Sequence, residues 1–195
     1  MNGLWMLVAQ AKESAEWFTG APIDDNAIAS IHSMLCKQMQ NIVLVGMPGC
    51  GKSTIGKLLA ERLGKQFVDS DASIVAASGM TIPEIFAQDA EMGFRAWESS
   101  VLEELGKQSG LVIATGGGCV TKYRNYPLLH QNGTIIWLQR DLDKLPTEGR
   151  PLSQTNSLTE MYTMRKSKYR RFADHTVDNN GDIETTLDKI MEVLA

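Results

Sequence analysis

The feature that most constrains this chain is a glycine-rich loop directly after a short apolar run. Residues 46–54 read GMPGCGKST, match the pattern GxxxxGK[ST], and follow IVLV at residues 42–45. In a strand–loop–helix unit, such a loop points successive backbone N–H groups at phosphates, its lysine reaches the β- and γ-phosphates, and its hydroxyl can ligate Mg²⁺. The pattern therefore predicts a nucleoside triphosphate site. The expected contacts are Gly46, Gly49, Cys50, Gly51, Lys52, Ser53 and Thr54.

Composition and charge narrow the class of protein. The 195 residues are 43% hydrophobic and 22% charged, which suits a globular enzyme with one substantial core. A formal net charge of −4 gives no general reason to expect nucleic acid or an anionic membrane as partner. The three cysteines are far apart and include no CxxC pair, which indicates reduced thiols in a cytoplasm. The apolar run at residues 4–9 is too short to span a bilayer.

From residue 41 onward, short apolar runs alternate with helical stretches, the pattern of a parallel sheet with helices on both faces. We therefore expect a three-layer α/β fold. Its five parallel strands are predicted at residues 42–45, 66–69, 111–115, 134–139 and 175–178. The first 40 residues add a helical appendage, with one amphipathic helix over about residues 4–18 and a second helix after it. Ligands in such sheets gather beyond the carboxyl ends of the strands.

Two carboxylates, Asp69 and Asp71, end the second predicted strand. In an extended segment, residues i and i+2 point to the same side, so these two side chains can share a site. One carboxylate would then hold Mg²⁺, directly or through water, while the other orients a hydroxyl and accepts its proton during attack on phosphorus. A solvated turn is the alternative for this pair.

A charged stripe lies on the later of two helices that we expect over residues 81–88 and 91–108. The spacing places Glu91, Arg95 and Glu98 along one face, where the carboxylates can fix the guanidinium. The alternative is an exposed ladder of ion pairs, worth only about 0.3–0.5 kcal/mol per pair.

Three glycines, Gly116, Gly117 and Gly118, follow the third predicted strand. Glycines allow a ligand to approach the backbone closely, and N–H groups there can bind hydroxyl or carboxylate oxygens. A flexible turn accounts for them equally well.

Two basic segments follow the fourth predicted strand. Residues 139–152 read as a polar loop that carries Arg150, and an arginine on a closing lid can neutralise a transferring phosphoryl group and exclude water. Residues 165–171, RKSKYRR, concentrate positive charge on a helix of a net acidic chain. Because a planar guanidinium suits bidentate binding of a carboxylate, the segment indicates an acidic small-molecule substrate. A solvated basic face is the alternative.

Together these motifs resemble shikimate kinase over residues 41–195. The resemblance rests on GMPGCGKST, FVDSDASI, TIPEIFAQDAEMGFRAWE, TGGG and GRPL, which occur in the family's order and near its spacing. It implies a P-loop kinase fold, Mg²⁺ as cofactor, and ATP-dependent phosphorylation of the shikimate 3-hydroxyl. That reaction belongs to the chorismate pathway to aromatic amino acids.

The resemblance also implies roles on the donor side of the site. Lys52 and Ser53 match the family's phosphate-loop residues, and Asp69 matches its magnesium-associated carboxylate. Asp71 matches the proposed base, which contacts the substrate hydroxyl, and Arg150 matches the lid arginine. The lid segment is shorter than many in the family and lacks the arginine pair often found beside adenine, so adenine contacts stay unassigned.

On the acceptor side, Arg95 and Arg170 match the two arginines that hold the shikimate carboxylate. Residues 116–118 match the substrate-side glycine turn. The family often reads R-x-P-x-Y before its second carboxylate arginine. Here residues 165–169 read RKSKY, so Ser167 replaces the proline.

The N-terminal residues have a resemblance of their own. Residues 2–11 and 17–20 look like the C-terminal helix of shikimate dehydrogenase, the enzyme that makes the kinase's substrate. This implies the kinase end of a dehydrogenase–kinase fusion, with a helical appendage at residues 1–40 and a kinase domain at residues 41–195. Gln10 would match a substrate-contacting glutamine, but the rest of that site is missing, so no dehydrogenase activity is expected. We expect the appendage's apolar face to need cover from the kinase domain or another chain.

Two alternatives to shikimate phosphorylation stay open. Another small-metabolite kinase, such as a gluconate kinase, shares the phosphate loop but does not predict Phe94-Arg95 together with residues 116–118. A non-catalytic nucleotide-binding module would keep the loop and lose turnover. The presence of Asp71 and Arg150 argues against it.

Overall fold

The chain divides into two compact units, Met1–Gln40 and Asn41–Ala195. The computed structural model describes residues 3–145 and 158–195. Within these ranges, no helix is long and apolar enough to cross a membrane.

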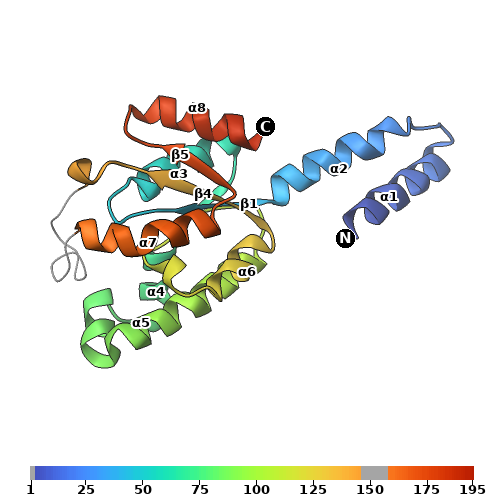
Figure 1. Cartoon of the computed structure of the whole chain (residues 1–195). Helices are drawn as coiled ribbons and strands as arrows, with labels where there is room; N and C mark the ends of the chain where they lie inside the picture. Colours follow the sequence, from blue (N-terminus) through green and yellow to red (C-terminus); the bar gives the residue numbers. More distant parts are fainter. Residues whose placement is uncertain (1–2, 146–157) are drawn as a thin grey trace. The chain divides into compact units, whose positions relative to one another are not determined.

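The larger unit is built on one sheet of five parallel strands in the order β2-β3-β1-β4-β5. Figure 1 labels three of these strands, β1, β4 and β5. The strands are β1 (Asn41–Val45), β2 (Gln66–Asp69), β3 (Leu111–Ala114), β4 (Gly133–Gln139) and β5 (His175–Asp178). Every residue of β1 is buried, as expected for a central strand covered on both faces. In the register, Leu44 lies beside Ala114 of β3 and Ile136 of β4. The carboxyl ends of these three strands therefore meet at one edge of the sheet.

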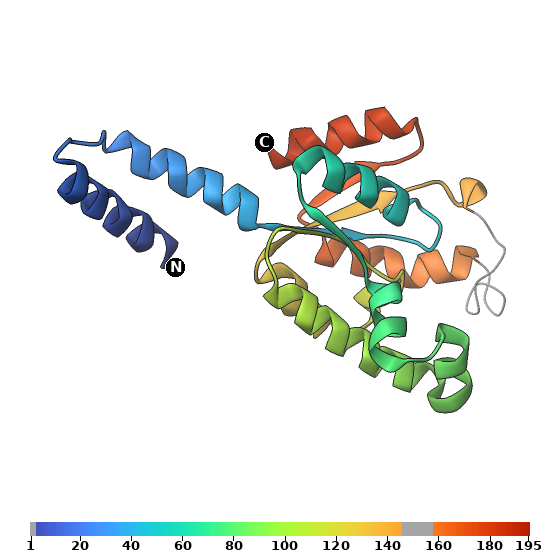
Figure 2. The same cartoon turned by 180° about the vertical axis from the view of Figure 1, so that it is seen from behind.

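Helices cover both faces of this sheet (Figures 1 and 2). One face carries α3 (Lys52–Leu63) and α8 (Ile183–Leu194), and the other carries α5 (Ile82–Lys107), α6 (Asn125–His130) and α7 (Leu158–Phe172). The unit also contains α4 (Ser70–Ser78) and the 3-10 helices η1 (Cys119–Thr121) and η2 (Leu142–Lys144). The predicted α/β fold, with three layers and a five-stranded parallel sheet, is confirmed.

Helix α5 begins with a capping box and is broken once along its length. The Glu84 N–H donates to the Thr81 hydroxyl, and the Glu84 carboxylate accepts from the Thr81 N–H. At Ala90 the backbone has φ 53° and ψ −162°, which interrupts the helix. The break lies between the two helices predicted over residues 81–88 and 91–108.

We expect Ala90→Gly to stabilise the protein. This backbone region is open almost only to glycine, and another residue held there costs on the order of 1–3 kcal/mol. Part of the gain is lost because glycine is more flexible in the unfolded chain. A net gain of about 1 kcal/mol would raise Tm by roughly 2–4 °C, measured by circular dichroism.

The matched control is Ala96→Gly, at an exposed position on the regular second part of α5. It should lower the free energy of unfolding by about 1 kcal/mol. An Ala90→Gly variant that is no more stable than wild type would contradict the strain at Ala90.

The smaller unit is a pair of helices, α1 (Leu4–Thr19) and α2 (Asn26–Met39). The Glu16 carboxylate accepts from the Ile23 N–H, and Lys12 pairs with Asp25. Within the described part of this unit, Val8 is the one buried apolar side chain. The exposed large apolar side chains are Trp5, Met6, Leu7, Trp17, Phe18, Ile31, Met34 and Met39. The pair of helices therefore has little core of its own.

Candidate active site

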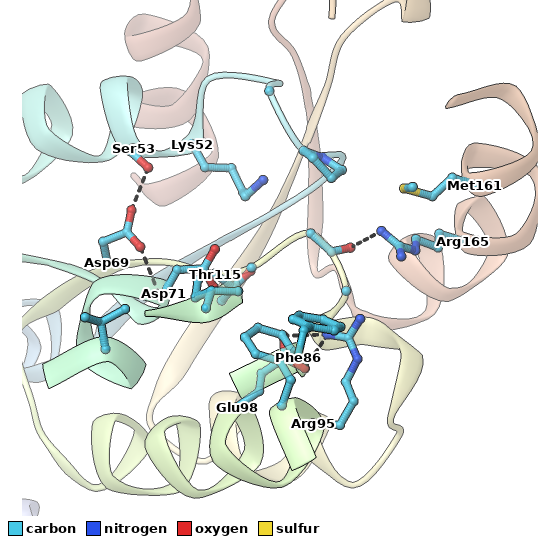
Figure 3. A pocket seen from close by; sticks show the side chains of 18 of the residues that line it. Lys52, Ser53, Asp69, Asp71, Phe86, Arg95, Glu98, Thr115, Met161 and Arg165 are labelled. Carbon is cyan, nitrogen blue, oxygen red and sulfur yellow. Dashed lines mark hydrogen bonds and ion pairs between the residues drawn. The ribbon is translucent and has the colours of Figure 1, made fainter. Parts of the chain in front are cut away.

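A cavity of about 660 Å³ lies beyond the carboxyl ends of the strands, within the size range of small-molecule sites (Figure 3). Its walls come from the phosphate loop, the junction of β2 and α4, helix α5, the turn after β3, and helix α7. The predicted site residues that line it are Gly49, Gly51, Lys52, Ser53, Thr54, Asp69, Asp71, Arg95, Gly116, Gly117 and Gly118. The fold thus brings together groups that are far apart in the sequence.

Lys52 lies at the first position of α3 and is folded over the phosphate loop. Its Nζ donates to the carbonyl oxygens of Gly46 and Met47 at 3.0 and 2.9 Å. Gly46 and Cys50, which we predicted to contact the nucleotide, do not line the cavity. The Cys50 side chain is fully buried, and its N–H donates to the Met47 carbonyl within the loop. These two residues therefore contribute to the shape of the loop without facing the cavity.

Asp69 connects the phosphate loop to α4. Its Oδ2 accepts from the Ser53 hydroxyl at 2.7 Å, and its Oδ1 accepts from the N–H groups of Asp71 and Ala72 at 3.0 and 3.4 Å. Asp69 is thereby the N-cap of α4. Hydroxyl and carboxylate oxygens are ligands that Mg²⁺ prefers, so Ser53 and Asp69 form a donor set that fits magnesium beside the loop.

Asp71 lies on the first turn of α4, and our expectation of an extended segment through both carboxylates is wrong. Strand β2 ends at Asp69, although both side chains do line the cavity. The Ser70 hydroxyl accepts from the Gly116 N–H at 3.0 Å, which holds this turn beside the glycines. A β-carbon at Gly116 would lie 2.7 Å from Asp71 Oδ1 and 3.1 Å from Glu98 Oε1. Only a residue without a side chain leaves room for these carboxylates.

Arg95 is buried, with 4% of its surface exposed, so the alternative of an exposed ladder is wrong. Its Nη1 donates to both carboxylate oxygens of Glu98 at 3.0 and 2.8 Å, and its Nη2 donates to Glu91 at 3.1 Å. Burial opposes the charge on Arg95, but the Glu98 and Glu91 carboxylates outweigh it and raise the Arg95 pKa. A side chain at Gly118 would overlap the guanidinium. Arg95 therefore stays charged against the glycine turn.

Glu98 is a site residue to which the sequence assigned only a place beside Arg95. Its side chain is fully buried and lines the cavity. Burial raises the pKa of Glu98, the Arg95 guanidinium lowers it, and the nearby Asp71 carboxylate raises it further. Glu98 thus couples electrostatically both to Asp71, the predicted base, and to Arg95, a predicted carboxylate-binding arginine. The i, i+3 spacing from Arg95 was the signal that pointed to it.

The structure does not bring Arg170, our predicted second carboxylate arginine, into the site, and it places Arg165 there instead. Arg170 is exposed and does not line the cavity, whereas Arg165 is 8% exposed, lines it, and donates from Nη1 to the Gly117 carbonyl at 3.2 Å. The two arginines are five residues apart on α7, about 140° around the helix axis, so they face different sides. Arg165 from α7 and Arg95 from α5 both reach the glycine turn (Figure 3).

Tyr169 fixes the orientation of α7. It lies one helical turn after Arg165, is fully buried, and its hydroxyl donates to the Gly117 carbonyl. Its ring stacks on Trp137 of β4 with 5.6 Å between ring centroids. Burial raises the Tyr169 pKa, so the phenol stays protonated and remains a donor. The packing of Tyr169 therefore turns Arg165 toward the cavity.

Arg150, our predicted lid arginine, lies outside the residues that the structure describes. The described residues form a site with two ends. At one end are the phosphate loop and the Ser53–Asp69 pair, and at the other are two guanidinium groups beside the glycine turn. Asp71 lines the cavity between them. Such a site can hold a small acid by its carboxylate and present one of its hydroxyls to a terminal phosphate.

The chain is similar to known proteins over most of its length. A family profile described as shikimate kinase matches residues 48–195. A shikimate kinase of Synechococcus elongatus is 42% identical over 165 residues, which cover 79% of this chain and 86% of that protein. A shikimate kinase of Acinetobacter baumannii is 37% identical over 166 residues, which cover 80% of this chain and 92% of that protein.

Solved structures agree with this similarity. The structure of shikimate kinase from Acinetobacter baumannii in complex with shikimate matches with a TM-score of 0.73 and 34% identity, covering 83% of this chain and 96% of that one. Shikimate kinase from Aquifex aeolicus matches with a TM-score of 0.71 and 28% identity, covering 79% of this chain and 95% of that one.

Proposed function

Because the chain belongs to the shikimate kinase family, we propose that it transfers the γ-phosphoryl group of ATP to the 3-hydroxyl of shikimate. The observation that carries this proposal is the place of Asp71, between the phosphate loop and two buried arginines in a single cavity. The relative that was solved with shikimate supports the choice of acceptor. The product is a precursor of chorismate and the aromatic amino acids.

On the donor side, the phosphate loop holds the triphosphate at the N-terminus of α3. Ser53, with Asp69 directly or through a water, is placed to hold Mg²⁺. When bound by these residues, Mg²⁺ would offset negative charge on the phosphates. The Lys52 amine exchanges its loop carbonyl partners for the β- and γ-phosphates. Arg150, which the sequence resemblance matches to the family's lid arginine, would add a second positive charge.

On the acceptor side, Arg95 and Arg165 bind the shikimate carboxylate through charge-assisted hydrogen bonds. Glu98 holds the Arg95 guanidinium in place, so the clamp is formed before substrate binds. Asp71 orients the 3-hydroxyl and accepts its proton as the oxygen attacks phosphorus. Catalysis then comes from positioning and charge, with no covalent enzyme intermediate.

Release of ADP with different acceptors tests the proposal. Purified protein is given MgATP with shikimate and, separately, with gluconate, and ADP is followed in a coupled assay. We expect ADP release that saturates with shikimate and stays at background with gluconate. Release with gluconate alone would indicate another small-metabolite kinase, and ATP binding without ADP release would indicate a nucleotide-binding module.

We also propose that residues 1–40 are the last helices of a shikimate dehydrogenase domain in a fusion. Support comes from the sequence resemblance, from their formation of a separate unit, and from Trp17 and Phe18, which are 91% and 89% exposed. A neighbouring domain would cover such side chains. The full-length reading frame tests this idea, and a start at Met1 with no upstream dehydrogenase sequence would contradict it.

We propose a cytoplasmic location for this enzyme. Cys36, Cys50 and Cys119 are all free thiols, as is usual in a reducing compartment. Burial raises the pKa of the Cys119 thiol to about 12, so that thiol is unreactive. Cell fractionation tests the location, and recovery outside the cytoplasmic fraction would contradict it.

A further inference from the structure

Arg140 lies beside the phosphate loop and has no role in the site described so far. It directly follows β4, and its Nη1 lies 3.9 Å from the position that a β-carbon on Gly51 would occupy. Gly51 is the last residue before α3 and lines the cavity. Arg140 itself does not line the cavity, so it approaches the loop from outside the acceptor site.

The strand order decides which part of a bound nucleotide Arg140 faces. Strand β1, which leads into the phosphate loop, lies between β3 and β4. The acceptor groups Asp71 and Gly116–Gly118 follow β2 and β3, whereas Arg140 follows β4. In-line transfer turns the γ-phosphate toward the acceptor. The α-phosphate and the nucleoside therefore extend toward the side of β4 and β5.

The other polar group near Gly51 is already engaged within the protein. Asn179, which follows β5, has its Nδ2 2.8 Å from the same β-carbon position on Gly51. That Nδ2 donates to the Cys50 carbonyl at 2.6 Å, and the Asn179 Oδ1 accepts from Thr186 at 2.8 Å. Asn179 thus holds the loop through Cys50. Among the described groups that a β-carbon on Gly51 would meet, Arg140 is the charged one.

Within the described ranges, the charge of Arg140 is not compensated by protein groups. Its Nε is buried without a hydrogen-bond partner there. The neighbouring carboxylates already have cations, since Asp141 pairs with Lys144 and Asp178 with Lys189, both at 3.6 Å. The buried Nε–H loses hydration that no described protein group replaces. An anion bound beside it would offset that loss.

We propose that Arg140 binds the α-phosphate of the nucleotide. Its guanidinium lies near Gly51, the last loop residue before α3, on the side of β4 and β5 toward which the nucleotide extends in this arrangement. The direction of the nucleotide rests on the proposed function, because the acceptor side is defined by Asp71. The binding itself requires no acceptor, so it can be measured without shikimate.

The experiment compares Arg140→Gln with wild type in calorimetric titrations with three magnesium complexes: ATP, GTP and inorganic tripolyphosphate. We expect all three to bind Arg140→Gln roughly tenfold or more weakly, since a charge-assisted hydrogen bond is lost whatever the base. Arg140→Lys keeps the charge without the planar fork and should fall between wild type and Arg140→Gln. Lys144→Gln removes a neighbouring exposed cation and should bind as wild type does.

Three outcomes would overturn the proposal. Equal binding by Arg140→Gln and wild type would remove Arg140 from the nucleotide site. A loss for ATP and GTP without a loss for tripolyphosphate would place the guanidinium on the nucleoside instead. A structural role would be indicated if nucleotide-free Arg140→Gln had a lower Tm than wild type, and if its weaker binding disappeared at a temperature where the variant is fully folded.

If the protein does not phosphorylate shikimate, the experiments give a result that differs from failure of the Arg140 proposal. Wild type would then release no ADP with shikimate, while the loss of nucleotide affinity in Arg140→Gln would still be measured. Conversely, shikimate-dependent ADP release together with unchanged nucleotide affinity in Arg140→Gln would overturn the role of Arg140 alone.

Discussion

Asp71→Asn is expected to lower kcat with shikimate by about 10²–10⁴-fold while leaving ATP affinity near that of wild type. The amide has the same size as the carboxylate but cannot accept the proton of the attacking hydroxyl. Asp71 lies on the first turn of α4, outside the phosphate loop, so its replacement removes no phosphate contact. Steady-state kinetics give kcat, and calorimetric titration gives the Kd for ATP.

Asp69→Asn is the matched control, because it makes the same chemical change two residues away. Asp69 accepts from Ser53 and caps α4, so its replacement should shift the Mg²⁺ concentration needed for half-maximal rate. Asp71→Asn should leave that concentration unchanged. Near-normal turnover in Asp71→Asn would remove Asp71 from the role of base.

Arg165→Met is expected to lower kcat/KM for shikimate by roughly 10²–10⁴-fold, with the KM for ATP little changed. Arg165 is buried at the cavity and donates to the Gly117 carbonyl, so its remaining N–H groups can reach a bound carboxylate. Hydrogen bonds to charged groups are worth about 1.5–3 kcal/mol each, and a bidentate contact loses two of them. Arg170→Met, on the exposed side of the same helix, should behave as wild type.

A second acceptor separates carboxylate binding from damage to the fold. The methyl ester of shikimate carries no negative charge, so the loss in Arg165→Met should be much smaller with the ester than with the acid. Equal losses with both acceptors would show that Arg165 acts by supporting the glycine turn. A loss in Arg170→Met as large as in Arg165→Met would contradict the choice of Arg165 over Arg170 as the residue that binds the carboxylate.

The fold could be predicted because its signals are local. The apolar run of β1 and the loop after it determine a strand, a turn and a helix within about 20 residues, as the bounds of β1 and α3 show. The same alternation of apolar runs located all five strands to within one residue at each end. The break in α5 at Ala90 also falls between two helices that periodicity separates.

The choice of clamp arginine could not be made by matching the motif alone, because it depends on how α7 is rotated against the sheet. Arg165 lies on a buried stripe with Met161 and Tyr169, each one turn away. Arg170 lies outside that stripe. The spacing of the buried stripe is present in the sequence, but residues 165–171 carry so many charged side chains that the buried face of the helix could not be identified.

Burial of the ion pair between Arg95 and Glu98 could not be predicted from the sequence either. The i, i+3 spacing is the same for an exposed pair and for a buried one, and this pair lies against the glycine turn, which is distant in sequence. Asp71 illustrates the competition between two local signals. We read an extended i, i+2 pair, whereas Asp69 acts as an N-cap and starts the helix one residue later.

Product analysis tests most directly the claim that one cavity brings ATP and shikimate together. Wild-type protein is incubated with MgATP and shikimate, and the products are followed by phosphorus NMR with proton correlation. We expect a single phosphate monoester on the 3-oxygen of shikimate, which grows in equal amount with ADP. Formation of ADP with inorganic phosphate and no ester, or an ester on another hydroxyl, would contradict it.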